Sequence, residues 1–275
     1  MKELSLREIQ LAELEILKKF ARICEEQGFR YYLFFGTLLG AVRHQGFIPW
    51  DDDVDVMMPR GDYERFLAYC AEQAASLKPY RIMHWTTNEQ YIYPIARFCD
   101  TRYQVDYDNA ADYGLGLFVD IYPFDGSGDM AEVAQRIYAT SAIKADLIYQ
   151  AGTTRFEKSS SGNPIRTCIK FIEYGVAKCL GARRLIISAE KMAKRRPFED
   201  SKYIQCVVWP GYRCKLFERE KMEKDAVLRF EDADFRVPAD YDHVLSVCYG
   251  DYMKLPPESE QIAHHYYKAY LKSES

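Results

Sequence analysis

The spacing of apolar residues predicts a long helix at the start of the chain. Apolar side chains recur at helical intervals from Leu6 to Ala21 and fall approximately on one face. Ser5 and Glu8 have the spacing of a capping box, which begins a helix, and Gly28 is a residue type that ends one. We therefore expect a helix between Ser5 and Gly28.

Two short strands are predicted after this helix, with a glycine turn and a second helix between them. The aromatic-rich run 31–35 fits a buried strand, and Gly36 and Thr37 open a short helical pattern that continues through Val42. Acidic and apolar residues then alternate over 53–58 until a proline stops the run, which indicates a second strand.

The rest of the pattern predicts an α/β or α+β protein with a mixed sheet. Further helices are predicted at 60–75, 131–149, 165–180, 184–194 and 240–247, and further strands at 80–85, 92–99 and 117–122. We expect one cooperative unit in three parts: a catalytic core at 1–125, a helical insertion or lobe at 126–200, and a C-terminal part at 201–275 that completes the unit.

Composition and charge narrow the class of protein. The chain has 275 residues, 48% of them hydrophobic, so it can bury one substantial core. A net charge of -4 and a pI of about 5.8 argue against a nucleic acid polymer as partner. Charges interrupt every apolar stretch near the N-terminus, and no later segment approaches the ~20 apolar residues of a spanning helix. We expect a cytoplasmic protein that does not cross a membrane.

The eight cysteines are scattered through apolar segments without a CxxC pair. This distribution favours buried free thiols in a reducing compartment. A zinc site composed of distant Cys and His side chains is the less favoured alternative, because neither His264 nor His265 has ligand spacing to another residue.

Two carboxylates on the predicted strand 53–58 form a candidate metal site. Side chains two apart on a strand point the same way, so Asp53 and Asp55 project together while Val54 and Val56 enter the core. A hard divalent cation, Mg²⁺ or Mn²⁺, relieves the repulsion between two carboxylates and prefers oxygen ligands. It would hold the phosphate oxygens of a nucleotide-activated donor and neutralise charge on the leaving phosphate.

The residues before this strand are second-rank candidates. Asp51, Asp52 and Trp50 precede the alternating run, and one of the two acids could be an outer ligand of the metal. An acidic cluster alone is more often a solvated loop than a metal site. The strand alternation, the preceding glycine turn and a separate acid embedded in an apolar run, Asp120, together reverse that preference.

Other residues are candidates for binding the phosphate groups of the donor. Gly36 and Thr37 begin the short helix, whose free N-terminal amides would bind phosphate. Arg43 could add a charge-assisted contact, although Arg43 and His44 also fit an exposed helix end. If the strand of Asp120 lies beside the first acidic strand, Asp120 could bind a second metal ion or accept the proton of an acceptor hydroxyl.

Two further features have an ordinary and a functional interpretation. The 22 tyrosines are expected to be core residues, although two or three could form an aromatic cage for a quaternary ammonium such as choline. The basic run 191–196 fits a solvated helix face, and peripheral contact with anionic lipid headgroups is the alternative.

Three segments together resemble a known family. Residues 36–60, GTLLGAVRHQGFIPWDDDVDVMMPR, closely resemble the signature of the LicD family, which is related to the fukutin and fukutin-related proteins. Residues 118–125, FVDIYPFD, and 249–257, YGDYMKLPP, resemble the family's downstream motifs in the same order. The resemblance covers nearly the whole chain.

The resemblance implies a nucleotidyltransferase-like α+β fold, in which a mixed sheet is flanked by helices and a helical lobe is added. The superfamily's pattern of a glycine turn, an Asp-x-Asp strand and a third acid maps onto Gly36, Thr37, Asp53, Asp55 and Asp120. It further implies transfer of phosphocholine, or a related phospho-alditol, from CDP-choline or another CDP-linked donor to a sugar hydroxyl of teichoic acid, lipopolysaccharide or capsule, with CMP as the leaving group.

Other functions stay open beside this one. A nucleotidyltransferase acting on a small molecule or sugar phosphate would use the same carboxylates, and a non-catalytic nucleotide- or glycan-binding protein would keep the fold. We expect unmatched loops such as 100–116, together with the helical lobe, to choose the donor headgroup and the acceptor. A lipid-linked saccharide acceptor would place the protein at the inner face of the cell membrane.

Overall fold

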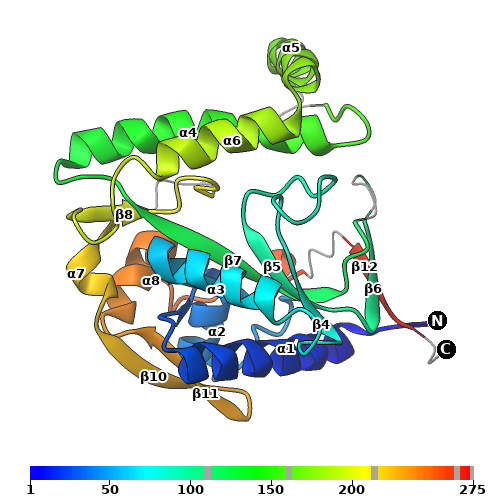
Figure 1. The fold of residues 1–275 in the computed structure, drawn as a ribbon, viewed down its shortest axis with the longest axis vertical. Coiled ribbons are helices and arrows are strands. Elements are labelled where there is room, and N and C mark those ends of the chain that lie inside the picture. Colours follow the sequence, from blue (N-terminus) through cyan, green and yellow to red (C-terminus); the bar gives the residue numbers. More distant parts are fainter. Residues whose placement is uncertain (108, 110–112, 159–162, 212–215, 263–266, 273–275) are drawn as a thin grey trace.

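The computed structural model is an α+β protein built around a mixed sheet, in agreement with the sequence (Figure 1). It describes the chain except for residues 108, 110–112, 159–162, 212–215, 263–266 and 273–275. Two smaller sheets and a group of three helices accompany the central sheet within these described residues.

The central sheet runs in the order β2-β3-β7-β5-β4, and β8 and β9 continue from β7. β3 (Asp55–Pro59) and β7 (Leu117–Gly126) are parallel neighbours, whereas β5 (Ala96–Asp100) is antiparallel to β7. The remaining strands are β2 (Tyr32–Leu33), β4 (Tyr80–Met83), β8 (Tyr203–Gln205) and β9 (Phe217–Glu218). β7 is buried along most of its length, so a carboxylate on it lies inside the protein.

Three helices close the core against this sheet. α1 (Leu6–Gln27) begins at the predicted capping box, ends at Gly28 with a left-handed φ of 67°, and packs against β5 and β7. α2 (Phe35–His44) packs against β3. α3 (Arg60–Glu72) follows β3 directly and packs against β3, β4 and β7. One continuous cluster of buried apolar side chains joins these elements.

The smaller sheets involve the C-terminal part of the chain. β12 (Tyr267–Leu271) pairs with β1 (Lys2–Glu3) and with β6 (Tyr103–Tyr107), so the first and the last strand of the described chain lie side by side (Figure 1). The other elements of this part are the hairpin β10 (Asp225–Phe230) and β11 (Ala233–Pro238), α7 (Arg219–Met222), α8 (Tyr241–Tyr249) and a 3₁₀ turn at Glu258–Glu260.

The group of three helices lies on one side of the central sheet. α4 (Ala131–Gly152) and α6 (Ala182–Ala193) pack along each other, and α5 (Pro164–Leu180) packs on α4 at one end of the molecule's longest axis, where Figure 1 shows it nearly end-on. None of the described helices is both long and apolar enough to cross a membrane.

The first acidic strand begins later than the sequence indicates. The alternation predicts a strand from Asp53, but β3 starts at Asp55, and residues 51–54 form the end of a loop. Hydrogen bonding between β3 and β7 nevertheless extends one residue before β3, because the backbone N–H of Asp120 donates to the carbonyl oxygen of Val54. Alternation therefore located the strand but not the residue at which the chain enters the sheet.

Two other expectations need correction and one lies beyond the described residues. The segment 100–116, expected as a loop, contains β6, which pairs with β12 from the far end of the chain. All the described cysteines are free, as expected, but Cys168 and Cys179 are exposed instead of buried. The stretch 159–164, SSSGNP, has the composition of a linker, and its residues 159–162 lie outside the described residues.

Candidate active site

Three buried charged side chains stand in one row across the central sheet. Asp55 on β3 is the register partner of Asp120 on β7, and Asp120 is the register partner of Arg97 on β5. Residues directly opposite each other on neighbouring strands project from the same face of a sheet. The two acidic strands are thus neighbours, and their carboxylates face the same side.

Arg97 fixes the Asp120 carboxylate. Its Nε donates to Asp120 Oδ1 over 2.6 Å, and its Nη1 donates to the Tyr107 hydroxyl over 3.0 Å. The guanidinium lies 4.4 Å from the ring centroid of Tyr93 and 4.0 Å from that of Phe118. Burial acts to lower the pKa of Arg97, but the charge of Asp120 and the nearby tyrosine hydroxyls together outweigh it, so the pKa lies well above its ordinary value. Asp120 therefore faces a permanent counter-charge.

Within the described part of the chain, no cation forms a comparable ion pair with Asp53 or Asp55. Burial, followed by the charges of Asp51 and Asp120, raises the pKa of Asp53 well above its ordinary value, and a hydrogen bond between the Asp51 and Asp53 carboxyls adds to the rise. Burial and the charges of Asp53 and Asp120 raise the pKa of Asp55, while a hydrogen bond from Tyr122 partly offsets them. Among the described residues, none hydrogen-bonds the buried Asp55 Oδ1. Negative charge at this site is poorly compensated by the protein.

This imbalance fits a divalent cation. A hard cation would compensate both carboxylates and take the unpartnered Asp55 Oδ1 as a ligand. The described residues contain no ready-made group of three His, Cys, Asp or Glu side chains around a metal position. Asp53 and Asp55 are the residues that would hold such an ion, whereas the Asp120 carboxylate is already paired with Arg97.

The start of α2 lies directly against these acids. The N-cap residue Phe34 gives no side-chain cap, so the first amides of the helix have no side-chain acceptor there. A Cβ on Gly36 would lie only 2.6 Å from Asp51 Oδ2, so only glycine lets the carboxylate approach this turn. Thr37 is buried, and its Oγ1 accepts a 2.8 Å hydrogen bond from the backbone N–H of Asp55. Gly36 and Thr37 thus couple the helix start to the acidic strand.

Arg43 connects α2 to the C-terminal motif. Its Nη1 donates to the carbonyl oxygen of Tyr252 over 2.9 Å, and its Nε donates to His44 Nε2 over 3.0 Å. Tyr249 of the same motif lies within electrostatic reach of the site, since burial of its hydroxyl and the charges of Cys248 and Asp55 raise its pKa. The motif therefore borders the acids, and Arg43 is already engaged in holding it.

The second-rank residues lie on the loop that leads into β3. Asp51 contacts Asp53 directly, as described above. Asp52 is buried, and its carbonyl oxygen lies 3.0 Å from the Tyr267 hydroxyl. The ring of Trp50 lies edge-on to His44, with 6.3 Å between centroids. Asp51 is thus the member of this group that the structure brings to the candidate metal ligands.

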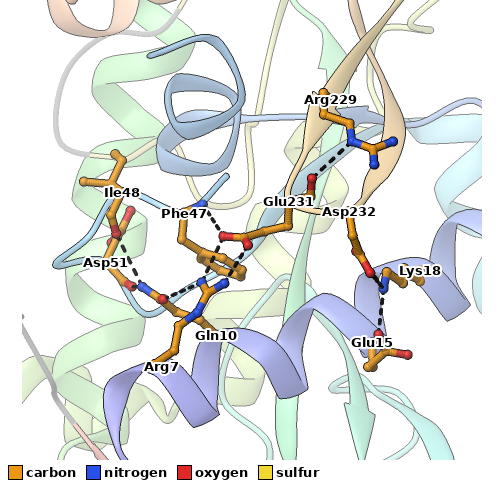
Figure 2. Close-up of polar contacts among 10 residues, drawn as sticks. All are labelled: Arg7, Gln10, Glu15, Lys18, Phe47, Ile48, Asp51, Arg229, Glu231 and Asp232. Atoms are coloured by element: carbon orange, nitrogen blue, oxygen red, sulfur yellow. Dashed lines mark hydrogen bonds and ion pairs between the residues drawn. The ribbon is translucent and has the colours of Figure 1, made fainter. Parts of the chain in front are cut away.

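Contacts from distant parts of the chain hold this loop in place (Figure 2). On α1, Gln10 Nε2 donates to the carbonyl oxygen of Asp51 over 2.8 Å. At the β10–β11 turn, Glu231 accepts from the backbone N–H of Phe47 over 3.2 Å and forms an ion pair with Arg7 over 2.6 Å. The position of the acidic loop therefore depends on both α1 and the hairpin.

A buried acid that the sequence pattern did not predict lies behind the site. Glu13 on α1 is fully buried, and its Oε1 lies 3.2 Å from the Tyr267 hydroxyl. Burial, then the charges of Asp53 and Asp52, raises the pKa of Glu13 well above its ordinary value. An acid on the apolar face of the first helix was the signal available in the sequence. Arg97 left no such signal, because its role depends on strand pairing.

The mixed sheet carries carboxylates on two parallel neighbouring strands, and a Gly-Thr pair lies at the start of the adjoining helix, as expected for a nucleotidyltransferase-like domain. Residues 28–160 match the family model described as LicD/FKTN/FKRP, nucleotidyltransferase domain. This range contains Gly36, Thr37, Asp53, Asp55 and Asp120. Residues 28–160 therefore form a LicD-family domain.

Individual relatives match the chain over different lengths. The lipopolysaccharide cholinephosphotransferase LicD of Haemophilus influenzae is 29% identical over 98% of this chain and 100% of its own length. An uncharacterised protein of Rickettsia typhi is 39% identical over 20% of this chain and 18% of its own length. One of Rickettsia prowazekii is 44% identical over 17% of both. The full-length similarity thus extends beyond the matched domain.

Proposed function

We propose that this LicD-like transferase moves phosphocholine, or a related phospho-alditol, from a CDP-linked donor to a hydroxyl of a cell-surface glycan precursor and releases CMP. The observation that carries the proposal is the full-length similarity to a protein named lipopolysaccharide cholinephosphotransferase. The arrangement of Asp53, Asp55 and Asp120 around one face of the sheet is compatible with it.

Each residue has a proposed role in this reaction. Asp53 and Asp55 hold Mg²⁺ or Mn²⁺, which supplies charge neutralisation at the donor diphosphate when bound. The first amides of α2, at Gly36 and Thr37, bind phosphate oxygens. Asp120, oriented by Arg97, accepts a hydrogen bond from the acceptor hydroxyl and then its proton.

These roles determine which bonds form and which break during the transfer. The acceptor oxygen attacks the phosphorus that bears choline, the new O–P bond forms as the bond to the CMP oxygen breaks, and the hydroxyl proton moves to the Asp120 carboxylate. Arg43 has a lesser place in this proposal, because its Nη1 already holds the Tyr252 carbonyl. It would act on the donor through the C-terminal motif.

Donor choice is tested with CDP-choline, CDP-ribitol and CDP-glycerol, each labelled in the headgroup and supplied with lipopolysaccharide and Mg²⁺. Label transferred to the glycan from CDP-choline, with stoichiometric CMP, is the expected result. Pyrophosphate release from a nucleoside triphosphate would instead identify a nucleotidyltransferase. Tight donor binding without turnover for any donor would identify a non-catalytic binding protein.

The acceptor and the cellular location belong to the same proposal. The name of the full-length relative favours lipopolysaccharide over teichoic acid or capsule as the acceptor class. A donor made from CTP and a lipid-linked saccharide acceptor would meet at the cytoplasmic face of the membrane. Cell fractionation with an antibody against this chain would test that location.

A further inference from the structure

Helix α5 turns its apolar side away from the protein. Six of its apolar residues recur at helical spacing and form one stripe, hereafter the α5 stripe: Ile165, Cys168, Ile169, Ile172, Val176 and Cys179. Every residue of the stripe is exposed, Ile165 to 70% and Ile172 to 65%. A surface helix of a globular protein ordinarily buries such a stripe against the core. The α5 stripe faces outward instead.

The opposite side of α5 anchors the helix. Ala177 is buried, and the Phe156 ring packs edge-on against Phe171 and Tyr174, with centroids 5.3 and 5.6 Å away. Lys178 Nζ donates to two carbonyl oxygens at the C-terminal end of α4, over 2.9 and 2.6 Å. The orientation of the stripe is therefore fixed by contacts and does not depend on the stripe itself.

The segment that carries the stripe is rich in basic residues. Residues 155–184 contain seven Lys or Arg and two Asp or Glu, a net charge of +5, in a chain whose net charge is -4. Arg155, Lys158, Arg166 and Arg184 are exposed, and Arg166 borders the stripe on the helix. An exposed apolar stripe bordered by cations is complementary to a bilayer surface that contains anionic lipid.

The earlier candidate for lipid contact fits less well. Within the basic run 191–196, Lys194 forms ion pairs with Glu64 over 2.7 Å and with Glu190 over 3.6 Å. A second copy of this chain is also a poor occupant of the stripe, because a symmetric contact through α5 would oppose two segments of charge +5. Anionic headgroups have the opposite charge.

We propose that α5 is an interfacial helix that inserts the α5 stripe among the headgroups of an anionic bilayer. The helix would lie in the plane of the interface, with its cations at the level of the phosphates. Its place at one end of the molecule, beyond α4 and α6, lets a flat surface reach it (Figure 1). This inference goes beyond the proposed transfer reaction and does not depend on it.

Vesicle sedimentation tests the proposal. The full chain is mixed with vesicles of phosphatidylcholine alone or with about one-third phosphatidylglycerol, and we expect about tenfold or stronger binding to the anionic vesicles. Ile172→Glu should weaken that binding about tenfold or more. The matched control is Val227→Glu on β10, since Val227 is exposed to 62% and Ile172 to 65%; it should bind like the unchanged protein.

A fluorophore gives the location of the contact. Cys168 is an exposed residue of the stripe, so it can be labelled with an environment-sensitive dye after Cys179→Ser and Cys214→Ser. A blue shift on adding anionic vesicles is expected. Equal vesicle binding by the Ile172→Glu variant, an unshifted dye on vesicle-bound protein, or a dimer that Ile172→Glu converts to a monomer would overturn the proposal.

Discussion

Asp55 and Asp120 lie side by side on two parallel strands, as direct register partners at the centre of the sheet. Arg97 completes the row beyond Asp120 and compensates only that carboxylate. The two acids are therefore unequal: Asp120 is oriented and charge-matched, whereas Asp55 and the nearby Asp53 carry uncompensated negative charge. In the proposed reaction, this asymmetry favours Asp53 and Asp55 as the metal ligands and Asp120 as the residue that orients the acceptor.

Replacing Asp53 should stabilise the metal-free protein while abolishing transfer. Asp53→Asn removes one of several crowded carboxylates, so the free energy of unfolding without added metal should rise by about 1 kcal/mol. Urea denaturation in EDTA measures the change, and donor turnover measures the loss. A variant that is both less stable and still active would contradict the proposed crowding.

Removing Arg97 should destabilise the protein strongly. Arg97→Met leaves Asp120 buried without its cation, which typically costs about 3 kcal/mol or more. The double variant Arg97→Met with Asp120→Asn should recover part of this loss, because no unpaired charge remains. Both are compared with the unchanged protein by urea denaturation. A single variant as stable as the unchanged protein would show that the ion pair is dispensable.

A side chain at Gly36 should displace the Asp51 carboxylate. In Gly36→Ala the new Cβ would approach Asp51 Oδ2 to 2.6 Å, so the acidic side chain must move and turnover should fall by about tenfold or more. Gly61→Ala is the control, because a Cβ there meets nothing within 4 Å. It should leave turnover unchanged and stabilise α3 by up to ~1 kcal/mol. Equal turnover by both variants would argue against a close packing requirement at Gly36.

Protonation of His84 should weaken the fold in acid. Burial, then the charges of Arg60 and Lys194, lowers the pKa of His84 to about 3. Between this value and the ordinary pKa of about 6.5, the unfolded chain binds a proton that the folded protein does not, so stability falls as pH decreases. The contribution is roughly 2 kcal/mol between pH 7 and pH 5.

The measurement compares the unchanged protein with His84→Gln. The free energy of unfolding is obtained at pH 7 and pH 5 for each, and the variant should show the smaller decrease on acidification. Lowered pKa values at Glu231 and Asp232 contribute in the same direction in both proteins and so cancel in the comparison. Identical decreases would contradict a buried neutral His84.

Local patterns in the sequence predict some parts of this site and not others. Period-two alternation puts Asp53 and Asp55 beside one another, and an isolated acid in an apolar run marks Asp120. The role of Arg97 cannot be predicted from local patterns, because its position opposite Asp120 depends on pairing between β5 and β7. Gly36 is recognisable as a turn residue, but its close approach to the Asp51 carboxylate depends on tertiary structure.

Local patterns in the sequence likewise predict only part of the fold. The first helix, with its capping box and its terminal Gly28, follows from neighbouring residues and is found as predicted. β12 and β6 pair across more than half of the chain, which no local pattern specifies. Helical spacing predicts the apolar stripe of α5, but this pattern alone predicts that the stripe is buried. Its outward orientation depends on how Phe156 and Ala177 hold the helix.

The most direct test of the central claim is CMP release from CDP-choline by the unchanged protein and by Asp55→Asn, with lipopolysaccharide as acceptor and with Mg²⁺ or EDTA. We expect Mg²⁺-dependent CMP release that EDTA abolishes and that Asp55→Asn lowers by about 10²-fold or more. The variant should remain folded, because Asp55 contributes uncompensated charge. CMP release that persists in EDTA, or that a folded Asp55→Asn variant retains in full, would contradict metal-assisted phosphocholine transfer at this site.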